Sequence, residues 1–119
     1  MKITLHYHVP IVLPGRLCPE VHTDLGSGGP VEVLVQLRAS LTDQGDVATM
    51  TDLDATLRAR QPIKVDVTIE KTDKRWTLNQ AVLAGFTAGH DPKVHNVGLF
   101  EFWLVAETCT VEEVTCPSG

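Results

Sequence analysis

The stretch PIKVDVTIEK, residues 62–71, is the clearest β-strand pattern in this chain of 119 residues. Apolar and polar side chains alternate along it, and a period of two places successive residues on opposite faces of a strand. We expect the polar set, which includes Lys64 and Thr68, to face water. The apolar set should face the core, and it comprises Ile63, Val65, Val67 and Ile69.

The residues after this strand predict a hairpin and then a less regular segment. KTDK, at 71–74, has the composition of a turn. RWTLN, at 75–79, should return antiparallel to the first strand with Trp76 and Leu78 pointing inward. Residues 80–88 fit either a short strand or a helical turn.

The most apolar part of the chain is LFEFWLVA, residues 99–106, which predicts a central strand covered on two sides. Phe100, Phe102 and Leu104 would point to one side, and Leu99, Trp103 and Val105 to the other. A domain of this size can cover one such face with its own second sheet, but covering both is harder. We therefore expect a partner protein or a second copy to cover part of the other face, with Trp103 as the anchor.

Two earlier segments show the same alternation and predict half-buried strands. The first is KITLHYHV at 2–9, and the second is VEVLVQLRA at 31–39. Between them, residues 14–30 contain three prolines and four glycines, a composition that predicts a long irregular loop. We expect this loop to be the most mobile part of the chain or to become ordered on a partner.

Residues 47–60 support two interpretations. Helix formers, an Asp54–Arg58 pair four residues apart and Pro62 as a stop favour a helix. Leucine and alanine also alternate with polar residues from Leu53 to Ala59, which favours a strand. We expect the strand, because a short helix with a narrow stripe of two leucines buries little apolar surface.

These patterns predict one all-β domain over residues 1–119, an antiparallel β-sandwich or small barrel of about seven strands with one long Gly/Pro-rich loop. No helix of about 12 residues is expected. The 15 valines and 13 threonines agree with a β fold. The predicted core comprises Ile3, Leu5, Tyr7, Val33, Val35, Ile63, Val65, Val67, Ile69, Trp76, Phe100, Phe102 and Leu104.

Charge and cysteine content argue against several functional classes. The formal net charge is −5, whereas a surface that binds nucleic acid needs clustered lysine and arginine. The longest apolar run is too short to cross a bilayer, so no membrane contact is expected. Cys18, Cys109 and Cys116 cannot all pair within one chain, and no secretory segment follows Met1. We expect folding in the reducing cytoplasm, with a Cys109–Cys116 bridge as the less favoured alternative.

Two histidines near the start of the chain raise the question of a metal site. On a strand, His6 and His8 would point to the same face and could chelate one transition metal. That face also carries Lys2 and Thr4, so we favour an ordinary solvent-facing surface with no bound cofactor. A third ligand would have to come from a loop, and the candidates are Glu20, His22, His90, Asp91 and His95.

No catalytic arrangement is visible in the sequence. Cys18 lies near His22 but matches no nucleophile signature, and GSGG at 26–29 lacks the ending of a phosphate-binding loop. We expect a non-enzymatic structural or interaction protein, a small subunit of a larger assembly such as a phage virion component (a decoration, connector or tail protein). Two alternatives stay open. One is a metal-binding β-barrel protein or metalloenzyme using His6 and His8, and the other is an acidic inhibitor of a host nucleic-acid-binding factor.

Overall fold

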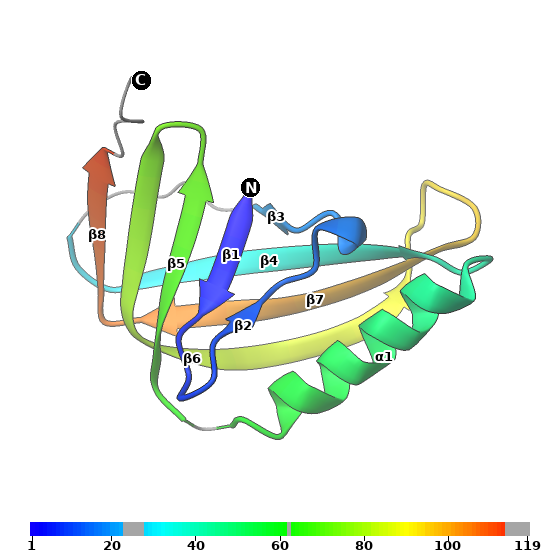
Figure 1. Ribbon diagram of the computed structural model, residues 1–119, viewed down its shortest axis with the longest axis horizontal. Helices are drawn as coiled ribbons and strands as arrows, with labels where there is room; N and C mark the ends of the chain where they lie inside the picture. The colour runs from blue at the N-terminus through cyan, green and yellow to red at the C-terminus, as the bar shows by residue number, and fades with distance from the viewer. Residues whose placement is uncertain (23–27, 62, 114–119) are drawn as a thin grey trace.

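An antiparallel β-sheet forms the body of the protein (Figure 1). The computed structural model describes residues 1–22, 28–61 and 63–113. Within these ranges the strands are β1 (Lys2–Leu5), β2 (Ile11–Val12), β3 (Glu20–Val21), β4 (Val31–Ser40), β5 (Val65–Lys71), β6 (Lys74–His90), β7 (Val97–Ala106) and β8 (Thr108–Glu113). A short 3-10 helix, η1 (Gly15–Leu17), and one α-helix, α1 (Gln44–Arg58), complete the described elements. The predicted all-β antiparallel class is confirmed, with eight strands in the sheet.

Strand β6 is shared by two layers of this sheet. Its first part, 74–79, pairs with β5 and β8, and its second part, 82–90, pairs with β7. Of the two alternatives for residues 80–88, the structure shows the strand, with a bend at Gln80, whose φ is 56°. The first layer consists of β2, β1, β5, the start of β6 and β8, and the second consists of the end of β6 with β7, β4 and β3. Strands of the two layers cross each other in Figure 1, as in a sandwich with crossed sheets.

The hydrophobic core lies between the two layers. All but three of the predicted core residues are buried. Tyr7 and Trp76 are half-buried at its margin. The prediction for Ile63 is wrong, because this side chain is 51% exposed. Its backbone N–H donates to the carbonyl of Arg60 (2.9 Å), so Ile63 belongs to the turn after α1 and precedes β5.

Residues 44–58 form a helix, so the prediction of a strand over residues 47–60 is wrong. The sequence before the helix explains why. The Asp43 carboxylate accepts hydrogen bonds from the backbone N–H groups of Gly45 (2.9 Å) and Asp46 (3.2 Å), which are donors that the first helical turn cannot satisfy itself. TDQGD at 42–46 therefore begins a helix, although its composition is that of a turn.

The buried face of α1 is as narrow as the sequence suggests. Leu53 and Leu57 are its buried side chains, and Met50 packs beside them at the edge of the core. A narrow face is enough to hold the helix on the sheet, because α1 packs against β4 at one end of the second layer and does not cover the whole core (Figure 1). At 15 residues, the helix also contradicts the expectation that no helix reaches 12. In the parts of the chain that the structure describes, no helix is long and apolar enough to cross a membrane.

The segment expected to be one irregular loop contains ordered elements. Helix η1 buries Leu17 completely, and Arg16 donates to Asp46 of α1 at 2.7 Å. Strand β3 pairs with β4 at the edge of the second layer. The prediction is therefore wrong for 15–17 and 20–21, while residues 23–27 lie outside the described ranges.

Candidate interaction surface

The outer face of the second layer carries an apolar patch that crosses three strands. We call it the outer patch, and it consists of Leu34 on β4, Val82 and Ala84 on β6, and Leu99, Trp103 and Val105 on β7. Trp103 lies opposite both Leu34 and Ala84, and residues directly opposite on antiparallel strands share a face. Trp103 is 38% exposed and Val105 is 40% exposed, so the centre of the patch is open to solvent.

Trp103 lies over a glycine in the neighbouring strand. The pairing of β6 with β7 is irregular between Ala84 and Thr87, and Gly85 in this bulge has a φ of 63°. A Cβ atom at Gly85 would lie 2.8 Å from Cδ1 of Trp103. The indole thus occupies the space that any other residue at position 85 would need, and the bulge fixes Trp103 on this face.

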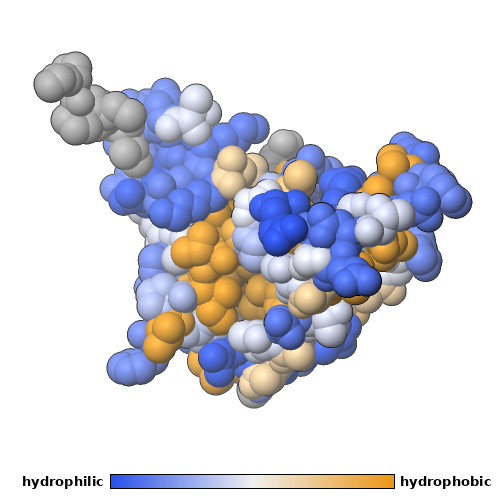
Figure 2. All heavy atoms as spheres, turned by 45° about the vertical axis from the view of Figure 1, so that its right-hand side comes forward, coloured by the Kyte–Doolittle hydropathy of each residue, from blue (hydrophilic) through white to orange (hydrophobic). Residues whose placement is uncertain are grey.

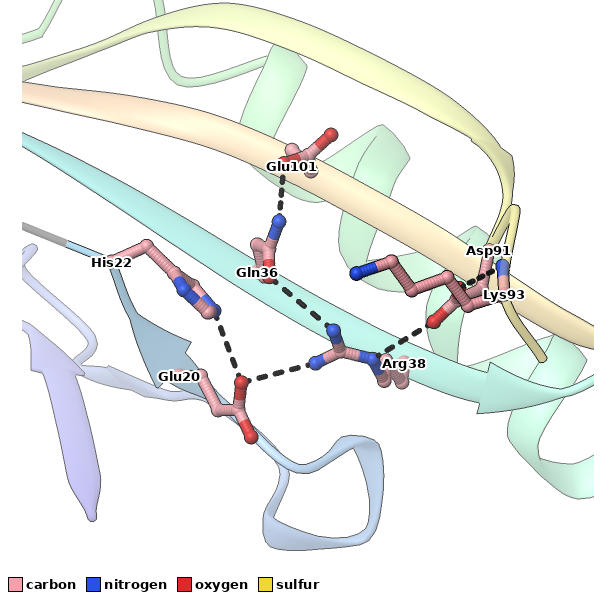
Figure 3. A network of polar contacts seen from close by, with 7 residues as sticks. All are labelled: Glu20, His22, Gln36, Arg38, Asp91, Lys93 and Glu101. Carbon is pink, nitrogen blue, oxygen red and sulfur yellow. Dashed lines mark hydrogen bonds and ion pairs between the residues drawn. The ribbon is translucent and has the colours of Figure 1, made fainter.

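A polar network borders the outer patch on the side of β3 (Figure 3). Gln36 donates to Glu101 at 2.6 Å, which joins β4 to β7. Arg38 donates to Glu20 on β3 at 3.1 Å and to Asp91, in the loop after β6, at 3.3 Å. The ring of His22 completes the network with a 3.0 Å contact to the same Glu20 carboxylate. The network therefore connects strands that are far apart in the sequence.

Hydrogen bonds stabilise the charges of Asp91 and Arg38. The backbone N–H of Lys93 donates to Asp91 at 2.8 Å and, together with the Arg38 guanidinium, lowers the pKa of this carboxyl group. Burial opposes the charge of Arg38, but the hydrogen bonds and charges of Asp91 and Glu20 outweigh it and raise the pKa of this guanidinium. The ion pair is partly shielded, because the Asp91 side chain is 9% exposed and that of Arg38 is 33% exposed. Both groups are therefore charged at neutral pH.

An open hollow joins this network to the outer patch. Its volume is about 410 Å³, and both Arg38 and Asp91 line it. Lys93 adds a second basic group, and Leu99 belongs to the hollow and to the outer patch. An apolar centre beside a polar rim with charges of both signs is the usual arrangement of a protein–protein interface.

A smaller hollow, of about 160 Å³, lies between α1 and the end of the second layer. It is lined by Val47 and Met50 of α1 and by Ala88 and Phe100 of the sheet, among other residues. Figure 2 shows one face of the molecule, on which apolar residues gather among polar ones. Thr51 contributes the one polar side chain of the lining, so the hollow offers little to orient a ligand. The alternation of residues 47–60 did not predict this hollow, because it favoured a strand over the helix that forms one of its walls.

The structure does not place His6 and His8 on a strand. Strand β1 ends at Leu5, so the prediction that both histidines share one strand face is wrong. The His6 ring instead contacts the Thr68 hydroxyl at 2.8 Å. In the described ranges, no three His, Cys, Asp or Glu side chains lie close enough together to hold a metal ion. Metal analysis of protein purified without a chelator tests for binding directly.

The residues predicted for the metal site and for the interface lie in different places. Glu20 is on β3, His22 directly follows this strand, His90 ends β6, and His95 is in the following loop. Leu99, Trp103 and Val105 lie together on the outer face of β7, as the alternation indicated. The sequence did not reveal that Glu20, Arg38 and Asp91 meet, because strand pairing between distant segments brings them together. Comparisons with protein-family models, curated proteins and solved structures find no match to this chain.

Proposed function

We propose that the protein is a non-enzymatic structural subunit of a larger protein assembly, and that the outer patch joins it to its neighbours. The observation that carries the proposal is Trp103, which is 38% exposed at the centre of an apolar patch on three strands. Large apolar side chains at the centre of an exposed patch, and tryptophan above all, supply most of the binding energy of protein interfaces.

The neighbour that we propose is another copy of this chain. The rim of the patch carries acidic groups, Glu20, Asp91 and Glu101, next to the basic groups Arg38 and Lys93. In a two-fold interface the same surface meets itself, so a rim with both signs can place acidic groups of one copy opposite basic groups of the other. A phage virion component, as expected from the sequence, is the kind of assembly that we propose, and isolation of an assembly that contains the chain would identify it.

Truncation of Trp103 tests this function. With 38% of the residue exposed, roughly 90 Å² of its surface is left for a partner to cover. Covering that area is worth about 2 kcal/mol per copy, or about 4 kcal/mol for the two copies of a two-fold dimer, so Trp103→Ala should weaken dimerisation by roughly 1,000-fold. Val12→Ala is the matched control, because Val12 is 50% exposed but lies on β2, at the edge of the first layer.

Sedimentation velocity over a range of concentrations gives the readout. We expect the wild type and Val12→Ala to associate alike and Trp103→Ala to shift towards the monomer, with circular dichroism showing that all three are folded. A wild type that is monomeric at every concentration, with a Trp103→Ala variant that loses only thermal stability, would contradict the proposal.

A further inference from the structure

An open hollow of about 370 Å³ lies between the turn after β1 and the segment after α1. Tyr7, His8 and Val9 line it from one side, and Arg60 and Ile63 line it from the other. Two backbone hydrogen bonds hold the two segments: the N–H of Tyr7 donates to Leu5 (3.1 Å), and the N–H of Ile63 donates to Arg60 (2.9 Å). The hollow is on the first layer, away from the outer patch.

Arg60 differs from the other arginines of the chain. Arg16, Arg38, Arg58 and Arg75 each form an ion pair with a carboxylate. Among the described residues, Arg60 has no acidic partner and no hydrogen-bond acceptor. Its buried Nε atom is unsatisfied, as is that of Arg75, which nevertheless pairs with Glu112. An arginine carries five N–H donors, so this hollow offers donors that no described residue uses. Buried polar atoms without a partner are rare and call for an explanation.

Tyr7 holds the guanidinium of Arg60 in place. The Cζ atom of Arg60 lies 5.5 Å from the centre of the Tyr7 ring, a cation–π distance. The Tyr7 hydroxyl is also buried without a partner among the described residues. Burial raises the pKa of this phenol, although Arg60 acts in the opposite direction, so the hydroxyl keeps its proton at neutral pH and is a further donor.

The walls of the hollow indicate which ligand fits. None of the five described residues that line it is acidic, although the chain carries a net charge of −5. Val9 is 69% exposed and Ile63 is 51% exposed, so apolar surface adjoins the guanidinium. A planar carboxylate matches the fork of one guanidinium, and the apolar surface beside it favours a carboxylate carried on an apolar group over inorganic phosphate, which has no apolar part.

We propose that this hollow binds a carboxylate carried on an apolar group, with Arg60 as the anion-binding residue, Tyr7 as its platform and Val9 and Ile63 as the apolar contact. A small organic acid and an acidic side chain of a protein partner present this same chemistry. The site is separate from the outer patch and does not depend on the function proposed for it.

Titration of the ¹⁵N-labelled protein with sodium benzoate, followed by NMR, tests the proposal. We expect the Nε–Hε signal of Arg60 and the amide signals of His8 and Val9 to shift saturably. Acetate, which lacks the apolar group, and inorganic phosphate should each bind at least about tenfold more weakly than benzoate. A capped Leu-Glu-Leu peptide presents the carboxylate of a protein, and whichever of peptide and benzoate binds more tightly identifies the source.

Two variants and one control make the test specific. Arg60→Gln should abolish the saturable shifts, and Arg60→Lys, which keeps the charge but loses the planar fork, should weaken binding by about tenfold. Arg58→Gln is the control, because Arg58 also lies over an aromatic ring, that of Phe86, but is paired with Asp54. The proposal fails if benzoate gives no saturable shift, if phosphate or acetate binds as tightly as benzoate, or if binding survives in Arg60→Gln. Should that variant not fold, unchanged binding in Arg60→Lys is the result that overturns it.

Discussion

The contact between Gly85 and Trp103 makes the substitution Gly85→Ala a sharp test of the second layer. Gly85 has a φ of 63°, a left-handed conformation that costs a residue with a Cβ atom roughly 1 kcal/mol or more. The new Cβ would also lie 2.8 Å from the indole, so Trp103 would have to move. We expect the two effects together to lower the free energy of unfolding by about 2 kcal/mol, or the Tm by roughly 8 °C.

Thermal denaturation and fluorescence give the readout, with Gly89→Ala as the matched control. Gly89 lies on the same strand, has no positive φ and would place its Cβ in open space, so its substitution should change the free energy of unfolding by under about 0.5 kcal/mol. In a Trp76→Phe background, fluorescence reports Trp103 alone, and the displaced indole should emit at longer wavelength in Gly85→Ala.

A double-mutant cycle separates the two causes. In a Trp103→Ala background the steric conflict is gone, so Gly85→Ala should cost only the backbone strain, about half of its effect in the wild type. An equal cost in both backgrounds would show that the indole does not lie over Gly85. A cost as small as that of Gly89→Ala would refute the left-handed conformation as well.

Three further results are expected. Val67→Ala should lower the free energy of unfolding by about 1–3 kcal/mol in chemical denaturation, because Val67 is fully buried. Thr68→Ala, on the other face, should cost less, about 1 kcal/mol at most, because it removes only the contact of a half-buried hydroxyl with the His6 ring. The reverse order would mean that the register of β5 is wrong by one residue. Hydrogen bonds and a neighbouring guanidinium lower the pKa of Asp91, so this carboxylate stabilises the folded state fully above its unfolded pKa of about 4. That contribution should be lost as the pH falls through the lower pKa of the folded state. The free energies of unfolding of the wild type and Asp91→Asn should therefore converge in acid. Cys18 is exposed and should react with a thiol reagent in the native protein. Cys109 is buried, and burial raises the pKa of its thiol, so it should react only after unfolding. Mass spectrometry of labelled peptides distinguishes the two.

Within the strands, period-two alternation predicted correctly which side chains face the core and which face outward. It placed Val67 inside and Lys64 outside, and it put Trp103 on the outer face of β7. The same pattern failed at strand ends, because alternation continues into residues that are no longer paired. Ile63 before β5 and His6 after β1 are both examples.

The remaining features depend on contacts that no short window of sequence contains. Leucine and alanine alternate with polar residues in α1 as they would in a strand, and the Asp43 cap is what distinguishes the helix. The bend of β6 requires a positive φ at Gln80, a residue type that seldom adopts one. Arg60 has no acidic partner among the described residues because the fold brings none of their carboxylates near it, and this can be recognised only in three dimensions.

Because β6 runs through both layers, neither layer is a separate folding unit. Opening the first layer removes the pairing partners of residues 74–79, and opening the second layer removes those of residues 82–90. Either opening therefore leaves half of one continuous strand without its inter-strand hydrogen bonds. Such shared elements couple local openings to global unfolding, and the most slowly exchanging amide protons should lie in β6 and β7. The local β5–β6 hairpin can form early. Strands β4 and β7, in contrast, pair residues that are far apart in the sequence, and closing that long loop makes their pairing the slow step of folding.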